Sequence, residues 1–139
     1  MIRLTRRYSF PAAHILANPA FSDEENCRIF GKCANPNGHG HNYDVEVTVT
    51  GPVDPETGQI VPIEYLDGLF DEVVRERFSH RMLNELERFD GLVPTAENIA
   101  RVIHEDLGAA FDDPRGATRL AHVRVVETPR NAFEYGDMP

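Results

Sequence analysis

The sequence has 139 residues, of which 41% are hydrophobic and 27% are charged, and its formal net charge is −9. This length and composition suit one globular domain, 1–139, and exclude a collagen-like or low-complexity chain. The acidic balance excludes a nucleic-acid or anionic-membrane surface, because such surfaces need clustered Lys and Arg. Apolar runs are too short to span a membrane and none follows the first residues, so we expect no signal peptide and a cytoplasmic protein.

The N-terminal part predicts two strands separated by a long connection. Over residues 2–14 every second residue is mostly apolar, and His14 continues that parity, which is typical of a half-buried strand. Residues 15–40 are rich in Asn, Pro, Gly and acidic residues, so we expect an irregular segment of turns and loops. Strict alternation from His41 to Thr50 predicts the second strand, which His39-Gly40-His41 opens.

The C-terminal part predicts two helices and then two strands. Apolar residues at helical spacing predict a helix over about 63–78 and, after a loop at 79–94, a second helix with Thr95 as N-cap. Strands are expected over 121–127 and 132–136. The order β–β–α–α–β–β predicts an α+β domain with a four-stranded antiparallel sheet and two helices on one face. Its two open edges favour a homo-oligomer, for example a closed barrel.

Three histidines form a predicted metal site. His39 and His41 occupy positions i and i+2 of a strand and therefore point to the same face. If the first two strands pair antiparallel, His14 comes beside them. Three His ligands with an open fourth position are typical of a catalytic zinc site. The alternative is a closed structural site made of Cys27, Cys33, His39 and His41, but its spacings do not match those of zinc fingers.

Other residues near these histidines have acid–base or binding chemistry. Cys33, beside Lys32 and near a bound cation, is expected to have a lowered thiol pKa and to act as a base or nucleophile. Cys27 fits a buried, inert role better. His80 is of the residue type that most often acts as general acid or base near pH 7, although alone it fits a surface role equally well. Glu127 continues the apolar parity of its strand, so it needs a partner such as the guanidine-like edge of a ligand.

Two motifs in this sequence belong together. Phe10-Pro11-Ala12-Ala13-His14 and Phe30-Gly31-Lys32-Cys33-Ala34-Asn35-Pro36-Asn37-Gly38-His39-Gly40-His41-Asn42-Tyr43 resemble the signature of the 6-pyruvoyl tetrahydropterin synthase family. That family includes the 6-carboxytetrahydropterin synthases of queuosine and deazapurine biosynthesis. The resemblance covers nearly the whole chain in order, through the further segments Asp54–Gly58, Ser79–Asn84, Pro94–Asn98 and Glu127–Asn131.

The resemblance implies a fold, an assembly and a reaction. The fold is the tunnelling fold, in which three subunits close a twelve-stranded barrel and two trimers stack into a homohexamer with active sites between subunits. The reaction is that of a zinc-dependent lyase, which converts 7,8-dihydroneopterin triphosphate to 6-pyruvoyl tetrahydropterin, releases triphosphate and needs no external redox cofactor. The resemblance also assigns roles: Zn2+ ligands His14, His39 and His41; catalytic thiol Cys33 with partner His80; pterin contacts Glu127 and Thr95.

The sequence departs from the family pattern at specific positions. Ser79 stands where the family has an Asp that orients the catalytic histidine, and a hydroxyl cannot stabilise an imidazolium as a charge does. Ala96 replaces a Thr on the pterin side. Five residues separate Cys33 from His39, a spacing that resembles the biopterin-type branch rather than the queuosine-type enzymes. The alternatives are a 6-carboxytetrahydropterin synthase, a side-chain-cleaving enzyme, and a non-catalytic pterin- or zinc-binding relative.

Overall fold

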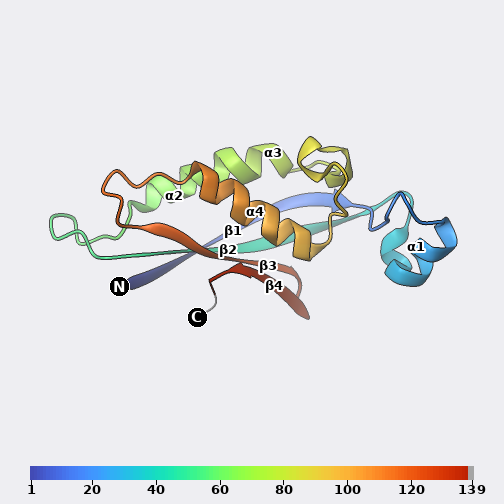
Figure 1. The fold of residues 1–139 in the computed structure, drawn as a ribbon, viewed down its shortest axis with the longest axis horizontal. Helices are drawn as coiled ribbons and strands as arrows, with labels where there is room; N and C mark the ends of the chain where they lie inside the picture. Colours follow the sequence, from blue (N-terminus) through green and yellow to red (C-terminus); the bar gives the residue numbers. More distant parts are fainter. Residues whose placement is uncertain (138–139) are drawn as a thin grey trace.

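A computed structural model describes residues 1–137, with the side chain of Cys33 outside the description. The four strands form one antiparallel sheet with the spatial order β1-β2-β3-β4. They are β1 (Ile2–His14), β2 (His39–Gly51), β3 (Arg119–Thr128) and β4 (Asn131–Gly136). One face of the sheet is covered by two helical segments (Figure 1). The first runs through α2 (Ile63–Phe70), the π-helical turn η2 (Asp71–Arg75) and α3 (Glu76–Phe78), and the second is α4 (Ala96–Ala110).

This architecture confirms the α+β fold class and the predicted order of the four strands and the two helical segments that cover the sheet. The residues that alternate in the strands do face the helices, and those of β2 are fully buried: Tyr43, Val45, Val47 and Val49. Helix α4 contributes Ile99, Val102, Ile103 and Leu107 to the same core. In the part of the chain that the structure describes, no helix combines the length and the apolarity needed to cross a membrane.

The prediction of an irregular segment over residues 15–40 is wrong. That segment contains helix α1 (Asp23–Phe30) and the 3-10 turn η1 (Gly31–Ala34). The Ser22 hydroxyl oxygen accepts a hydrogen bond from the Glu25 backbone N–H at 3.2 Å, and three acidic residues occupy the first turn, both of which stabilise a helix N-terminus. The Ser22-x-x-Glu25 spacing is that of a capping box, and it was outweighed by the turn-forming composition around it.

Helix α1 projects beyond the end of the sheet (Figure 1). Cys27 lies on this helix and is exposed, so the prediction that it is a buried cysteine is wrong. The reason is the position of α1, since a helix outside the sheet–helix sandwich cannot bury its side chains in the core. The predicted loop at 79–94 also contains short helical turns, η3 (Leu83–Glu85) and η4 (Glu87–Phe89).

The segment after α3 runs beside the free edge of β1. The His80 backbone N–H donates to the Pro11 carbonyl oxygen at 2.7 Å, and the Ala13 N–H donates to the Arg81 carbonyl oxygen at 2.9 Å. Ala13 and Met82 form a parallel bridge at the same place. These bonds cover the end of β1 next to His14 and hold residues 80–82 there.

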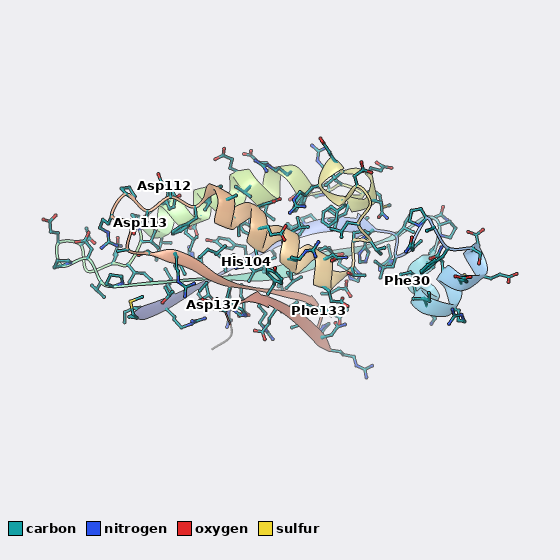
Figure 2. All side chains as sticks on the ribbon, in the orientation of Figure 1. Phe30, His104, Asp112, Asp113, Phe133 and Asp137 are labelled. Atoms are coloured by element: carbon teal, nitrogen blue, oxygen red, sulfur yellow. The ribbon has the colours of Figure 1, made fainter. Side chains whose placement is uncertain are left out.

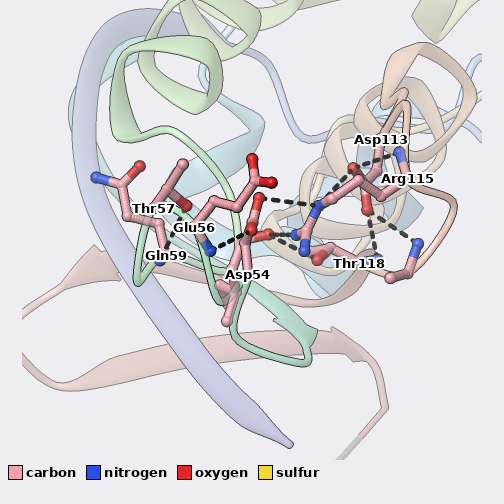
Figure 3. Close-up of polar contacts among 9 residues, drawn as sticks. Asp54, Glu56, Thr57, Gln59, Asp113, Arg115 and Thr118 are labelled. Carbon is pink, nitrogen blue, oxygen red and sulfur yellow. Dashed lines mark hydrogen bonds and ion pairs between the residues drawn. The ribbon is translucent and has the colours of Figure 1, made fainter.

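The opposite end of the molecule is held by a polar cluster (Figure 3). Asp113 accepts hydrogen bonds from the backbone N–H groups of residues 115, 117 and 118, and the bond from Thr118 contributes most to lowering the pKa of Asp113. Arg115 and Thr118 both donate to the Ile60 carbonyl oxygen at 2.7 Å. Figure 2 shows Phe30 of α1 and Asp113 at opposite ends of the molecule. This cluster therefore stabilises loops at the end of the molecule that lies away from α1.

Candidate metal centre and active site

The pairing of β1 with β2 brings the three predicted histidines together. The register places His14 opposite His39 and Ala12 opposite His41, and the alternation of the strand puts both β2 histidines on the helix-covered face. The ligand nitrogens of His14, His39 and His41 all lie within 4.8 Å of one another. The Nε2 atoms of His14 and His39 are 2.8 Å apart. The predicted convergence of the three imidazoles is therefore confirmed.

His14 is oriented by the backbone of a different element. Its ring is buried, and its Nδ1 lies 2.8 Å from the Pro94 carbonyl oxygen, to which a ring nitrogen can only donate. This bond fixes the tautomer in which Nε2 carries the free electron pair and faces the other two rings. A metal-ligating histidine needs this arrangement, because its second nitrogen must be held by a hydrogen-bond partner.

Burial keeps the imidazoles of His14 and His39 neutral. Desolvation, together with the neighbouring rings of His39 and His41, lowers the pKa of His14 to about 4. Desolvation is also the main reason that the pKa of His39 is lowered, and His41 adds to the effect. Both rings are therefore uncharged near pH 7, which is the form that binds a metal ion without first losing a proton.

Two buried polar atoms at the site have no hydrogen-bond partner within the described chain: Nε2 of His41 and Oε2 of Glu127. Burying an unpaired polar atom is unfavourable, so such atoms mark a place that a ligand completes. A metal ion would satisfy His41, and three imidazole nitrogens form a donor set that suits Zn2+ with an open fourth position. The residues present thus fit a catalytic metal.

The position of Cys27 does not support the alternative of a closed metal site with four protein ligands. Among the described residues, the group that could hold a metal ion consists of the three histidines alone. Cys27 is exposed on α1 and does not belong to that group. One of the four ligands that the closed site requires is therefore absent from it.

Glu127 lies at the border of the histidine group. It continues the inward face of β3 after Val123 and Val125, and its side chain is 15% exposed. Its Oε2 is 3.9 Å from Nε2 of His14, but a neutral His14 does not neutralise the carboxylate. The carboxylate consequently keeps an oxygen for a ligand, as its position in the sequence predicts.

His80 lies beside the end of β1, where its backbone N–H donates a hydrogen bond to the Pro11 carbonyl oxygen. It is exposed and has a left-handed backbone with φ of 60°, a strained conformation for a residue other than Gly that is common at functional sites. It lines a pocket of about 600 Å3 together with residues 11–13, 40–42, Arg81 and Met82. His41, one of the three grouped histidines, lines the same pocket, as do its neighbours Gly40 and Asn42. Among the described residues, His80 is not one of those grouped as possible metal ligands.

The remaining predicted residues are placed less directly. The buried Ser79 hydroxyl oxygen has no hydrogen-bond partner in the described chain, so it does not hold the His80 ring here. Thr95 caps α4 as predicted, accepting a hydrogen bond from the Asn98 N–H at 3.2 Å, and it follows the Pro94 carbonyl that orients His14. Cys33 belongs to η1, but its side chain lies outside the described residues, so its role as catalytic thiol stays a prediction.

Two contacts to His14 were missed by sequence reasoning. One is the Pro94 carbonyl, for which no side chain gives a signal. The other is Tyr43, whose hydroxyl lies 3.2 Å from Nδ1 of His14. Tyr43 shares the parity of His39 and His41, and that continuation was the available signal. Of the other histidines, His104 packs edge-on against Tyr135 with ring centroids 5.1 Å apart and is not a member of the group.

Known proteins are similar to this chain in sequence and in fold. The model of the 6-pyruvoyl tetrahydropterin synthase family matches residues 3–137. The 6-pyruvoyl tetrahydrobiopterin synthase of Homo sapiens is 41% identical over 134 residues, covering 96% of this chain and 90% of the human protein. The structure of Caenorhabditis elegans 6-pyruvoyl tetrahydropterin synthase has a TM-score of 0.90 at 38% identity, covering 99% of this chain and 96% of that one.

A more distant relative represents the other branch. The 6-carboxy-5,6,7,8-tetrahydropterin synthase of Bacillus subtilis is 31% identical over 101 residues, covering 70% of this chain and 66% of that protein. The match to the family model extends over nearly the whole chain, and it includes every residue of the histidine group. The chain belongs to the 6-pyruvoyl tetrahydropterin synthase family.

Proposed function

We propose that this chain is a zinc-dependent lyase that converts 7,8-dihydroneopterin triphosphate to 6-pyruvoyl tetrahydropterin and releases triphosphate. The observation that carries the proposal is the buried histidine group beside the unpartnered carboxylate of Glu127. A pterin with a hydroxylated side chain needs both features side by side. The carboxylate binds the pterin ring, and the histidine group holds the metal for the side-chain hydroxyls. The identity to the human synthase supports the same substrate.

The residues of this chain divide the work between binding and proton transfer. Glu127 accepts two parallel hydrogen bonds from the pterin's amino and N3 groups, a bidentate and charge-assisted clamp, and Thr95 contacts the pterin. His14, His39 and His41 hold Zn2+, which supplies Lewis acidity to the side-chain hydroxyls when it is bound. Cys33 and His80 take and return the carbon-bound protons, with Ser79 beside His80. The side chain is oxidised and the ring reduced within one molecule.

The proposed assembly is a homohexamer made of two stacked trimers. Strands β1 and β4 are the two edges of the sheet, and pairing them between copies closes a barrel. We expect His80, which is exposed and outside the histidine group, to act at the metal site of a second copy in this assembly. Light scattering should give the mass of six 15.7 kDa chains, and a stable monomer would refute the assembly.

A second candidate is a 6-carboxytetrahydropterin synthase, which the Bacillus subtilis relative favours. The five-residue spacing between Cys33 and His39 favours the first candidate. Incubation with 7,8-dihydroneopterin triphosphate separates them by product mass and released triphosphate. The mass of 6-pyruvoyl tetrahydropterin supports the proposal, the 6-carboxy product supports the second candidate, and binding without turnover indicates a non-catalytic relative.

A further inference from the structure

The basic residues of this acidic chain fall into two groups. Most arginines lie within 4.0 Å of a carboxylate oxygen: Arg6, Arg7, Arg75, Arg88, Arg101, Arg115, Arg119 and Arg124. The basic side chains for which the described chain provides no carboxylate partner are Arg3, Arg28, Lys32, Arg77, Arg81 and Arg130. In a chain of net charge −9, cations left without a carboxylate are available to an anionic ligand.

Two of these free cations are attached to the segments that carry the histidine group. The Arg81 carbonyl oxygen accepts the hydrogen bond from the N–H of Ala13, the residue before His14. Lys32 lies in η1 (Gly31–Ala34), the turn that leads into β2 and His39. Both side chains are exposed, and neither makes a hydrogen bond within the described chain.

A third free cation follows the carboxylate at the border of the site. Arg130 lies in the turn between β3 and β4, three residues after Glu127, and its backbone N–H donates to the Thr128 hydroxyl oxygen at 3.2 Å. Glu127 is itself 3.9 Å from His14. The turn is therefore anchored near the histidines, while the exposed guanidinium of Arg130 is left to solvent. Arg28 is different, because in the last turn of α1 its charge stabilises the helix dipole.

We propose that Lys32, Arg81 and Arg130 bind the triphosphate of the substrate. This inference rests on the proposed function, and it adds the residues that recognise the polyphosphate end. Arg forks and Lys ammonium groups are the usual partners of phosphate oxygens. Because these cations have no carboxylate partner, binding the triphosphate breaks no ion pair. The local positive charge also offsets the repulsion of a polyphosphate by an acidic chain.

The test compares Lys32→Gln, Arg81→Gln and Arg130→Gln with the matched control Arg3→Gln. The control removes the same charge from another free cation, eleven residues from His14 along β1 and so roughly 35 Å away at about 3.3 Å per residue. The readouts are the KM for 7,8-dihydroneopterin triphosphate and the Kd of inorganic triphosphate by calorimetry. Each of the three variants should weaken both by about tenfold, whereas Arg3→Gln should leave both unchanged.

Two further measurements separate a binding role from a structural one. Arg81→Lys should recover part of the triphosphate affinity, because it keeps the charge. Binding of sepiapterin, which has no phosphate, should be the same in all variants, and so should the zinc content.

The outcomes separate this inference from the proposed function. If inorganic triphosphate and the substrate bind the three variants as tightly as Arg3→Gln, the inference is overturned even though turnover stands. If the wild-type chain fails to turn over the substrate but the three variants alone lose affinity for inorganic triphosphate, the anion site stands and the proposed reaction falls.

Discussion

His14 links the backbone of the fold to the chemistry of the site. It is the last residue of β1, it faces inward with the core, and its Nδ1 is held by the Pro94 carbonyl. These constraints leave Nε2 as the atom of His14 that faces His39 and Glu127. A neutral, oriented imidazole in a buried place is what a resident metal requires.

Removing either β2 histidine should remove most of the bound zinc. His39→Ala and His41→Ala each leave two imidazoles, which cannot complete the three-ligand set. Elemental analysis of the purified variants measures this directly, with Cys27→Ala as a control that should retain its zinc because Cys27 is exposed on α1. Undiminished zinc in both histidine variants would refute the assignment of the three histidines as zinc ligands.

Glu127→Gln should weaken pterin binding by about 2–4 kcal/mol, from one lost hydrogen bond and one unsatisfied donor. The substitution keeps the size of the side chain but turns an acceptor into an NH2 group that faces the pterin's own donors. Calorimetry with sepiapterin or biopterin measures the change. Glu56→Gln, an exposed residue in the remote cluster of Figure 3, is the control and should change binding by less than about 0.5 kcal/mol. An equally small effect at Glu127 would place the pterin elsewhere.

Cys33→Ala should abolish turnover while the fold and the zinc are kept. The reason is that a metal ion polarises the substrate but does not itself take the carbon-bound proton. Cys27→Ala should be nearly silent, since that thiol is exposed on a helix outside the core. Steady-state rates and zinc content of the two variants check this, and reversed effects would show that the wrong cysteine has been named.

At the scale of elements, the connection into β2 limits which residues can precede the metal site. Gly38 has φ of 73°, and a Cβ there would lie 2.7 Å from Cε of Met82 and 3.1 Å from the carbonyl oxygen of His14. The chain therefore needs a glycine both for the left-handed backbone and for the close approach. This turn, with the 80–82 segment, encloses the end of β1.

Gly38→Ala should destabilise the protein and reduce its zinc affinity, and Gly58→Ala is the matched control. Gly58 has almost the same φ, 74°, but no atom lies within 4 Å of its added Cβ. Both variants should lose about 1 kcal/mol for the left-handed backbone, and only Gly38→Ala should lose more because Met82 or His14 must move. Denaturant unfolding and zinc titration measure the difference, and equal losses in the two variants would contradict the steric argument.

Elements with a strong periodic pattern could be predicted, and the site could be predicted where it rests on that pattern. The alternation in β1 and β2 gave the strands and also the shared face of His39 and His41. Helix α1 was missed because its signal is a cap and acidic residues rather than an apolar stripe. The Pro94 carbonyl could not be predicted, since a backbone oxygen has no sequence signature. The position of His80 depends on a left-handed residue and on pairing with β1, and both are non-local.

At the scale of the whole molecule, the sheet has two edges that differ in how far they are open. The β1 edge is covered near Pro11 and Ala13 by the segment that carries His80, so only its N-terminal part is free to pair. The edge strand β4 is short, and short edges limit non-specific pairing. Together these features favour one defined contact between copies over open-ended aggregation.

The proposed action of His80 at the metal site of a second copy has a genetic consequence: two inactive chains can complement each other. His80→Ala and His39→Ala should each be inactive alone. When the two are unfolded, mixed in equal amounts and refolded together, about a quarter of the shared sites should combine an intact histidine group from one chain with an intact His80 from another. Activity in the mixture should therefore approach a quarter of the wild-type value, whereas a site built within single chains would give none, because no chain in the mixture carries both residues.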